Sequence, residues 1–400
     1  MDFAFTSEQE MIRGQAAEFL RRECPMNLVR RVMASEHGQS DELWGGMAAL
    51  GWMGLVFPEE YGGAGLGFVE LAIVLEEMGR ALAPGAYFST VLLGGLALME
   101  AANEEQKQRW LVPLAAGKLK ATLALSEAEE RFGPEGIALK AERRDGGFVL
   151  NGTKLFVPDA HLADLIICAA RTSGASKTDE GVTLFAIDRA CDGLKLTPLK
   201  TMDETRRLYE VSFEQARVAP DCALGNAGGG WPVIAKILDL AAIGLCAEMV
   251  GGARRVLEMC VEYLKTRVQF GRPIGGFQAL QHRTADMLLL VESAKSAVYA
   301  AACAAGDNSS ETPLLAAIAK AYTSDAYAWI AGEGIQLHGG MGFTWEHDAH
   351  LYFKRAKADE IAFGDATHHR ARVAEMIGLT REAGIPDQEK VDQEKVRSAG

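Results

Sequence analysis

The sequence lacks the cysteine patterns that build disulfide frameworks or zinc sites. Its 400 residues contain seven cysteines, which are scattered and include no C-x-x-C pair. Such thiols are typical of reduced, intracellular proteins, so we expect a cytoplasmic location without disulfides or structural zinc.

An excess of basic residues and a long apolar run are also missing. Lysine and arginine number 41 against 54 aspartates and glutamates, which gives a formal net charge of −13. An acidic chain repels phosphate backbones, which argues against nucleic-acid binding. The longest uncharged stretch, residues 81–99, is interrupted by proline and glycine, and the N-terminus has no basic run before an apolar core. We therefore expect no membrane insertion and no secretory signal peptide.

Motifs for hydrolytic or metal chemistry are absent as well. Neither H-E-x-x-H nor G-x-S-x-G occurs in the sequence. The densest group of possible ligands, residues 346–350 (E-H-D-A-H), lacks a third ligand at a typical spacing. We expect hydrogen-bonded polar residues there and no bound metal.

Hydrophobic periodicity divides the chain into helical, β and helical parts. From Ser7 to about Leu114 apolar residues recur at helical spacing. From about Ala121 the period becomes two, and Asn151-Gly152 between two apolar runs predicts a hairpin. Further strands are expected at residues 165–168, 182–187, 194–196 and 209–213, which together suggest a compact antiparallel sheet or barrel.

Long helices rich in alanine, leucine and methionine return after Gly228-Gly229-Gly230. The segment 285–305 is apolar on nearly all sides, which predicts burial in a bundle. The sequence therefore predicts domains at 1–118, 119–228 and 229–380. Residues 381–400 contain the repeat DQEKV-DQEKV and little apolar surface, so we expect a disordered tail.

Two segments mix charge, glycine and aromatic residues in a way that packing alone does not require. The first is RVQFGRPI, residues 267–274, followed by Phe277-Gln278. Glycine and proline end the preceding helix, which places Arg267 in its last turn and Phe270 at its exit. The arginine can hold a diphosphate or stabilise its own helix C-terminus.

The second segment is QLHGGMGFT, residues 336–344. Its three glycines in four positions allow the backbone to approach a ligand or another chain closely. A tight turn between helices is the alternative interpretation.

Together these segments resemble the acyl-CoA dehydrogenase family. Its R-x-x-F-G-x-P-I followed by F-Q is complete here, and so is its Q-x-x-G-G-x-G-F. Weaker echoes are PEEYGG at 58–63, the N-G-x-K run at 151–154 and Leu224-Gly225. The resemblance covers roughly residues 5–380. It implies an α+β fold with an N-terminal helical domain, a middle antiparallel β-barrel and a C-terminal four-helix bundle.

The resemblance also implies FAD, held between barrel and bundle and in contact with a neighbouring subunit. The residues that would hold the diphosphate and adenine half, largely across a dimer interface, are Arg267, Phe270, Gln278, Gln336, Gly339 and Gly340. Leu125 and Ser126 on a barrel strand, with Phe156 after the hairpin, would line the isoalloxazine ring. The family usually has T-E-P and then G-S-D on this loop, whereas residues 126–134 are SEAEERFGP. Val157-Pro158 likewise replaces a threonine-containing pair, and the proline removes a backbone donor.

The catalytic base is the largest departure from the family pattern. Many members have glutamate before glycine and threonine, and counting from Gly339-Gly340 places Phe363-Gly364-Asp365 there. Phenylalanine cannot accept a proton. A second placement known in the family falls near Ala241-Ala242, which also offers no acid.

Glu248 is the remaining candidate on that helix. Glycines at i−4, i+3 and i+4 surround it in an apolar stretch, so we expect cleared space in which a carboxyl resists ionisation and a flat ligand can approach. The pattern AEMVGG, residues 247–252, resembles a branch of the family that acts on bulky CoA thioesters, including steroid side chains, often as mixed oligomers. The alternative is that Glu248 is a buried structural acid paired with an arginine such as Arg255. Asp365 is the second candidate for the base, although it would need the loop to shift.

The implied reaction is α,β-dehydrogenation of an acyl-CoA to the trans-2-enoyl-CoA. A carboxylate removes the α-proton, the β-hydrogen leaves as hydride to flavin N5, and an electron-transfer flavoprotein takes the electrons. A homo-oligomer or a heterotetramer with a related chain is implied. Two alternatives stay open: a structural or flavin-poor subunit of a mixed tetramer, and a related flavin oxidase or monooxygenase.

Overall fold

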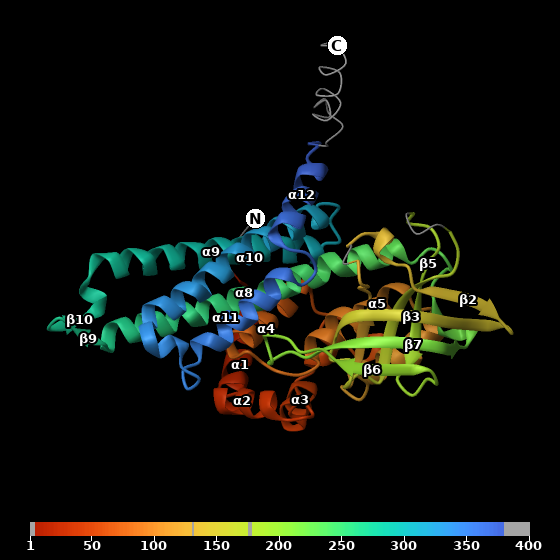
Figure 1. The fold of residues 1–400 in the computed structure, drawn as a ribbon, viewed down its shortest axis with the longest axis horizontal. Helices are drawn as coiled ribbons and strands as arrows, with labels where there is room; N and C mark the ends of the chain where they lie inside the picture. Colours follow the sequence, from red (N-terminus) through yellow and green to blue (C-terminus); the bar gives the residue numbers. More distant parts are fainter. Residues whose placement is uncertain (1–4, 130–131, 175–177, 380–400) are drawn as a thin grey trace, which may run out of the picture.

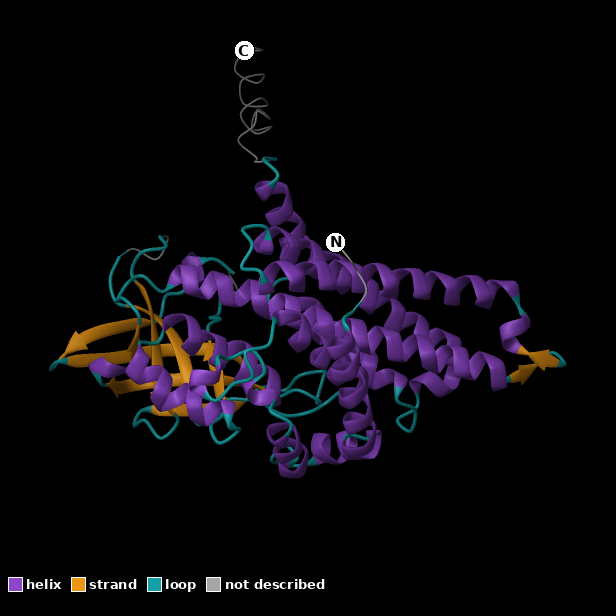
Figure 2. Ribbon diagram, turned by 180° about the vertical axis from the view of Figure 1, so that it is seen from behind, coloured by secondary structure: helices purple, strands orange, loops and turns teal. Residues whose placement is uncertain are grey.

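The computed structural model describes residues 5–129, 132–174 and 178–379, which form a helical unit, a sheet and a second helical unit (Figure 1). The expected tail at 381–400 lies outside these residues. Figures 1 and 2 place the sheet at one end of the molecule and the long helices of the C-terminal unit towards the other.

The N-terminal unit is helical, as the periodicity predicts. Its α-helices are α1 (Ser7–Glu23), α2 (Met26–Ala34), α3 (Asp41–Ala49), α4 (Phe68–Ala81), α5 (Leu96–Ala101), α6 (Glu104–Gln106) and α7 (Val112–Ala115). Two stretches, Ser89–Gly95 and Lys107–Leu111, have π-helical hydrogen bonding. Thr6 and Gln9 form a capping box that begins α1. Helix α4 is buried along most of its length because it packs on α8 of the C-terminal unit.

The middle unit is a sheet, and strands occur at each of the four segments predicted after the hairpin. Its strands are β1 (Ala121–Ala124), β2 (Lys140–Arg144), β3 (Gly147–Pro158), β4 (Leu165–Arg171), β5 (Val182–Asp188), β6 (Leu194–Pro198), β7 (Leu208–Val218) and β8 (Ala223–Leu224). Strands β2 and β8 were not predicted. The order is β6-β7-β3-β2-β4-β5-β8, with β1 also paired to β4. The expected antiparallel pattern is wrong at β1–β4 and β2–β4, which pair in parallel. Within the described residues the ladder runs from β6 to β8 and does not pair these two ends.

The hairpin predicted at Asn151-Gly152 is wrong. Strand β3 continues through both residues, and the turn lies at Asp145-Gly146, where both residues have positive φ. Gly152 sits at a register shift against β7, and Asn151 Oδ1 accepts hydrogen bonds from the backbone and side chain of Gln215. An Asn-Gly pair suits a bulge as well as a turn, because both need a residue that tolerates positive φ.

The described part of the C-terminal unit contains long α-helices and a small hairpin. Its α-helices are α8 (Trp231–Thr266), α9 (Gln278–Gly306), α10 (Thr312–His338), α11 (Ala349–Ile361) and α12 (Ala366–Met376), and the hairpin between α8 and α9 is formed by β9 (Val268–Gln269) and β10 (Arg272–Pro273). Helix α8 is central and packs on α4, α9 and α10.

The predicted burial of residues 285–305 holds only in part. One face of α9 is buried, through residues such as Met287 and Val291, whereas Leu288 and Leu289 are 49% and 66% exposed. Among the described helices, α9 alone is long and apolar enough to span a membrane by length and composition, a test that core helices of globular proteins also pass. The expectation of no membrane insertion stays a prediction.

Candidate flavin and substrate site

The residues expected to hold a diphosphate lie at the free end of the long helices. Helix α8 ends at Thr266, so Arg267 is the capping residue and does not belong to the last turn. The hairpin turn that follows has positive φ at Phe270 and Gly271, and the Phe270 ring is 89% exposed. Arg267 has no ion-pair partner among the described residues, so its guanidinium is available to an anion.

The second glycine segment lies beside the first. Gln336 is in the last turn of α10, and the Tyr263 ring of α8 lies 4.7 Å from the His338 ring at the end of α10. A Cβ atom at Gly339 or Gly340 would meet nothing within 4 Å. Gly339 has a φ of +59°, a backbone conformation that favours glycine, whereas neither packing nor a positive φ within this chain explains Gly340. The open backbone is suited to a ligand or another chain.

The residues expected at the flavin ring lie at the edge of the sheet. Leu125 and Ser126 follow β1 and are in a loop, not on the expected strand, and the Ser126 carbonyl accepts a hydrogen bond from Leu155 N–H at 2.8 Å. Phe156 lies within β3 at a register shift, with φ of +56° and a 43% exposed ring. The exposed Phe156 side chain beside the loop of Leu125 and Ser126 is suited to contact with a flat ring system.

Lys154 holds this edge in place. Its fully buried ammonium donates to the Leu125 carbonyl at 3.0 Å and lies 2.6 Å from Glu127 Oε1. The same carboxylate oxygen accepts the Ala138 and Leu139 N–H groups at 3.0 Å each. The loop after Glu127 also meets α12, since the Phe132 and His368 rings lie 4.9 Å apart. Lys154 was part of a noted motif, but sequence reasoning assigned it no such role.

The two groups of flavin residues are far apart in one chain. Helix α8 begins beside the sheet, where Gly230 N–H donates to Val182 O, and ends at the hairpin 36 residues later. At 1.5 Å per residue that length is about 54 Å, much longer than one FAD molecule. The residues present therefore fit FAD in two halves: one chain would hold the ring and a second chain the diphosphate.

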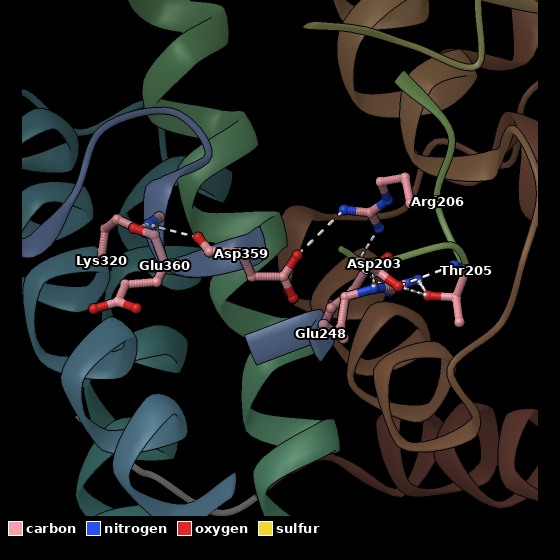
Figure 3. A network of polar contacts seen from close by, with 8 residues as sticks. Asp203, Thr205, Arg206, Glu248, Lys320, Asp359 and Glu360 are labelled. Carbon is pink, nitrogen blue, oxygen red and sulfur yellow. Dashed lines mark hydrogen bonds and ion pairs between the residues drawn. The ribbon is translucent and has the colours of Figure 1, made fainter. Parts of the chain in front are cut away.

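A buried polar junction joins the sheet to the helices (Figure 3). The loop between β6 and β7, residues 199–207, directs Arg206 between α8 and α11. Its Nη2 lies 2.5 Å from Glu248 Oε2, and its Nη1 lies 3.6 Å from Asp359 Oδ1. One guanidinium thus bridges carboxylates from two helices.

Arg355 binds the same loop from α11. Its Nε donates to Asp203 Oδ2 at 2.8 Å and its Nη2 donates to Thr205 Oγ1 at 2.6 Å. Its Nη1 lies 3.8 Å from Glu248 Oε2. Asp203 also accepts the N–H and hydroxyl groups of Thr205, so its carboxylate is fully engaged. Glu248 is therefore paired with arginines, but Arg255 is not one of them.

The expected open space beside Glu248 is also wrong. A Cβ at Gly251 would overlap the Glu76 carbonyl, and one at Gly252 would overlap the Tyr327 hydroxyl. Gly244 faces the Leu92 side chain. The glycines admit α4 and α10 against α8 and leave no room for a flat ligand. The space beside a glycine on one helix is filled by residues of other elements. The sequence of that helix alone does not show which residues these are.

Asp365 and Phe363 have structural roles in the structure. Asp365 is exposed and caps α12, where its Oδ1 accepts His368 N–H at 2.7 Å. The Phe363 ring stacks on Phe88 at 5.9 Å between centroids. Lys320, fully buried on α10, donates to the carbonyls of Asp359, Glu360 and Gly364 at 3.0 Å each and so fixes this turn.

Two buried carboxyls of the junction have raised pKa values. Burial raises the pKa of Asp159, which accepts a hydrogen bond from Ser89, to about 6. Burial raises the pKa of Asp359 to about 7, although Arg355 and Arg206 act against it. Sequence reasoning missed Asp159, Arg206, Arg355 and Asp359. A charged stretch such as residues 203–207 is usually solvated, so nothing local marked it as buried.

Comparison with known proteins identifies the family. Models of the N-terminal, middle and C-terminal domains of acyl-CoA dehydrogenase match residues 6–118, 122–216 and 228–378. The chain therefore belongs to the acyl-CoA dehydrogenase family, a family of oxidoreductases whose members are FAD-dependent flavoproteins.

Individual relatives span almost the whole chain. Acyl-CoA dehydrogenase IpdE2 of Mycobacterium tuberculosis is 39% identical over 87% of this chain and 91% of that protein. A chain of the ChsE4-ChsE5 complex from Mycobacterium tuberculosis is 27% identical, with a TM-score of 0.86 over 95% of this chain and 100% of that chain. A variant of the steroid ACAD Tcur3481-Tcur3483 is 29% identical, with a TM-score of 0.82 over 92% of this chain and 97% of that chain.

Proposed function

We propose that the protein oxidises an acyl-CoA thioester to the trans-2-enoyl-CoA within an oligomer that completes each flavin site. The observation that supports this most directly is the separation of the two flavin-binding groups along α8. At one end lie the open Gly339-Gly340 and Arg267, which has no ion-pair partner among the described residues. At the other end lies the edge of Leu125 and Ser126 that Lys154 supports.

In this proposal the hairpin end of one chain holds the diphosphate and adenine half of FAD. Arg267, Gln278 and Gln336 donate hydrogen bonds there, and the open glycine backbone allows close approach. Leu125, Ser126 and Phe156 of the other chain contact the ring. When bound, the flavin accepts the β-hydrogen of the substrate together with its two electrons.

The substrate we propose is a bulky acyl-CoA, such as a thioester of a steroid side chain. Support comes from the likeness to the steroid ACAD Tcur3481-Tcur3483. We further propose a cytoplasmic enzyme that passes electrons to an electron-transfer flavoprotein. These assignments rest on family resemblance and on composition.

A second candidate is a structural subunit of a mixed tetramer whose partner chain supplies catalysis. Two points favour it: Glu248 is already engaged by Arg206 and Arg355, and Phe363 falls at the position where the family resemblance leads us to expect an acid. The ChsE4-ChsE5 complex provides a related assembly of two named chains.

An anaerobic titration of the purified protein with acyl-CoA thioesters, from short fatty to steroid-derived, separates the two. We expect one substrate class to bleach the oxidised-flavin absorbance band. Flavin that is absent, or that is bound and never reduced, would contradict the enzyme proposal for the chain alone. The same titration with a co-expressed related chain then tests the subunit proposal.

A further inference from the structure

Helix α10 presents an apolar stripe at the surface of the chain. Its large side chains Ile318, Tyr322 and Trp329 are 39%, 38% and 40% exposed. At about 3.6 residues per turn these positions fall on one narrow side of the helix, and the exposed Gln336 continues the same line to the helix end. The outer side of a surface helix usually carries charged residues, whereas apolar residues usually face the core. The stripe therefore has the composition of a surface that another molecule covers.

The two charges on this side of α10 are already neutralised. Asp325 forms an ion pair with Arg370 of α12, and Glu333 Oε2 lies 2.6 Å from Nη1 of Arg283 on α9. The lysine of α10, Lys320, is fully buried. The whole chain has a formal net charge of −13, so two copies repel each other on average. The α10 stripe is a place where two copies can meet without unpaired like charges facing each other.

A glycine beside Trp329 leaves room on the stripe. Gly332 lies about one turn further along α10, and a Cβ atom there would meet nothing within 4 Å. Its φ is not positive, so neither packing nor backbone conformation within this chain explains a glycine at this position. Glycine inside a helix is destabilising relative to alanine. The bare backbone here allows an aromatic side chain of another molecule to pack beside Trp329.

The course of the helices gives the stripe a direction. Helix α8 runs from the sheet to the hairpin, α9 leads back, and α10 runs towards the hairpin end again (Figure 1). The stripe from Ile318 to Gln336 is about 27 Å long. It ends directly before the open Gly339 and Gly340. Each proposed flavin site needs the hairpin end of one chain and the sheet edge of another, so the second chain must lie along these helices in the opposite direction.

We propose that the α10 stripe binds the same stripe of a second copy of this chain, with the two helices antiparallel and Trp329 close to the two-fold axis. This inference rests on the flavin-sharing oligomer proposed above and assigns the surface that forms it. A contact about a two-fold axis uses the same patch on both copies, so the patch must be compatible with itself. An apolar stripe whose charges are paired meets this condition. Antiparallel packing carries the hairpin end of each copy towards the sheet of the other, whereas parallel packing would place the two hairpin ends together.

The two-fold axis fixes which residues face each other. Residues at equal distances from Trp329 along α10 meet across the interface, so Tyr322 of one copy lies opposite Gln336 of the other. The tyrosine hydroxyl and the glutamine amide are then able to form a hydrogen bond. Tyrosine and tryptophan are common at such interfaces because each buries a large apolar ring and keeps one polar group for a partner.

The test places charges at the two-fold axis in the FAD-loaded full chain. Trp329→Glu or Trp329→Lys alone puts two like charges opposite each other and should weaken self-association by about 30-fold or more, as expected for a central interface residue. An equimolar mixture of the two variants should restore the assembly, because opposite charges then meet. Sedimentation velocity over a dilution series measures the dissociation constants, and far-UV circular dichroism checks that the variants are folded. Met11→Glu is the matched control, since Met11 is also an exposed apolar residue but lies on α1, and it should assemble like the wild type.

An anaerobic acyl-CoA titration of the same samples separates this inference from the proposed function. Loss of assembly in both variants with recovery in the mixture supports the stripe as the contact. Wild-type assembly in both variants, or loss without recovery in the mixture, overturns it, and flavin bleaching by the wild type then leaves the proposed function intact. A wild-type chain that is monomeric alone and assembles only with a co-expressed related chain also overturns the proposal of a second copy.

Discussion

The glycines of the sheet-side junction and those of the hairpin end have opposite surroundings. At the junction, a Cβ on Gly251 would overlap the backbone of α4, and one on Gly252 would overlap Tyr327. At the hairpin end, a Cβ on Gly271, Gly339 or Gly340 would meet nothing within 4 Å. Glycine serves packing in the first region. In the second, packing does not explain it: the positive φ of Gly271 and Gly339 favours glycine, and Gly340 has neither reason within this chain.

The charged groups differ in the same way. Arg206 and Arg355 are engaged in buried ion pairs at the junction. Arg267 lacks an ion-pair partner in the part of the chain that the structure describes. Changes at the junction should therefore alter the stability of one chain, whereas changes at the hairpin end should alter what the chain binds.

The largest effect is expected at Arg355. Replacement by leucine leaves Asp203 and part of the Glu248 charge buried without compensation, and breaking a buried pair in this way costs about 3–5 kcal/mol. Urea unfolding of Arg355→Leu measures this cost. Arg254→Leu is the control, because Arg254 is 43% exposed and 3.8 Å from its partner Glu258, and such surface pairs contribute about 0–1 kcal/mol. Equal losses in both variants would remove the distinction between the two regions.

The pH dependence of stability should report the raised pKa of Asp359. The pKa of Asp359 is about 7 in the folded chain and about 3.9 when unfolded. The folded state therefore binds an extra proton between these values, and this group lowers stability as pH rises through that window, with its full penalty above 7. The Tm of Asp359→Asn minus that of the wild type should rise from pH 5 to 7 and then level off.

His369 provides the opposite sign as a control. Its pKa is lowered by burial to about 3 from an ordinary value of about 6.5. Below the higher value the unfolded state binds a proton that the folded state does not, so stability is lost as pH falls towards 3. The Tm difference between His369→Gln and the wild type should rise with falling pH. Slopes of the same sign for the two variants would contradict one of the two assignments, and the sign would show which.

Gly251→Ala is expected to have the next largest effect. The added methyl group must push α4 away from α8, and overpacking of this kind costs about 1–3 kcal/mol. Thermal unfolding should show a clear fall in Tm. Gly340→Ala is the matched control at the open end, where no atom of the chain lies within 4 Å of the new Cβ. A similar fall in Tm for Gly340→Ala would show that the open end is not open in the assembled protein.

The sequence predicted the features that depend on residues close together in the chain, such as helices and strands. Helical periodicity predicted the helical unit that contains α1 to α7, and the short apolar runs located β4 to β7. The hairpin predicted at Asn151-Gly152 was wrong because a turn and a β-bulge both need a residue that tolerates positive φ. Only the pairing of β3 with both β2 and β7 shows that this position is a bulge.

The site followed the same rule. The Arg267 and Gly339 segments were recognisable because each is a continuous motif. The partners of Glu248 were not, because Arg206 is 42 positions away and lies on a different element. Contacts between elements distant in sequence decide whether a buried acid is paired or free, and one sequence without its fold does not specify them.

The smallest effect on the chain itself is expected at Arg267, and it sharpens the comparison most. Arg267→Ala removes an exposed side chain without an ion pair in the described structure, so the free energy of unfolding should stay within about 0.5 kcal/mol of the wild type. If the arginine holds the FAD diphosphate, losing hydrogen bonds to a charged group costs about 1.5–3 kcal/mol, which weakens FAD affinity by roughly 10–150-fold. Fluorescence titration of the apoprotein with FAD measures this. Lys265→Ala, two residues earlier in the last turn of α8, is the control. An equal loss of affinity there would indicate general charge attraction and not a specific contact. The residues expected at the flavin ring and those of the hairpin end lie at opposite ends of α8. If two subunits share each FAD, mixing Arg267→Ala chains with chains altered at Phe156 should restore about a quarter of the FAD sites. Random pairing makes half of the dimers mixed, and each mixed dimer has one site in which both halves are intact.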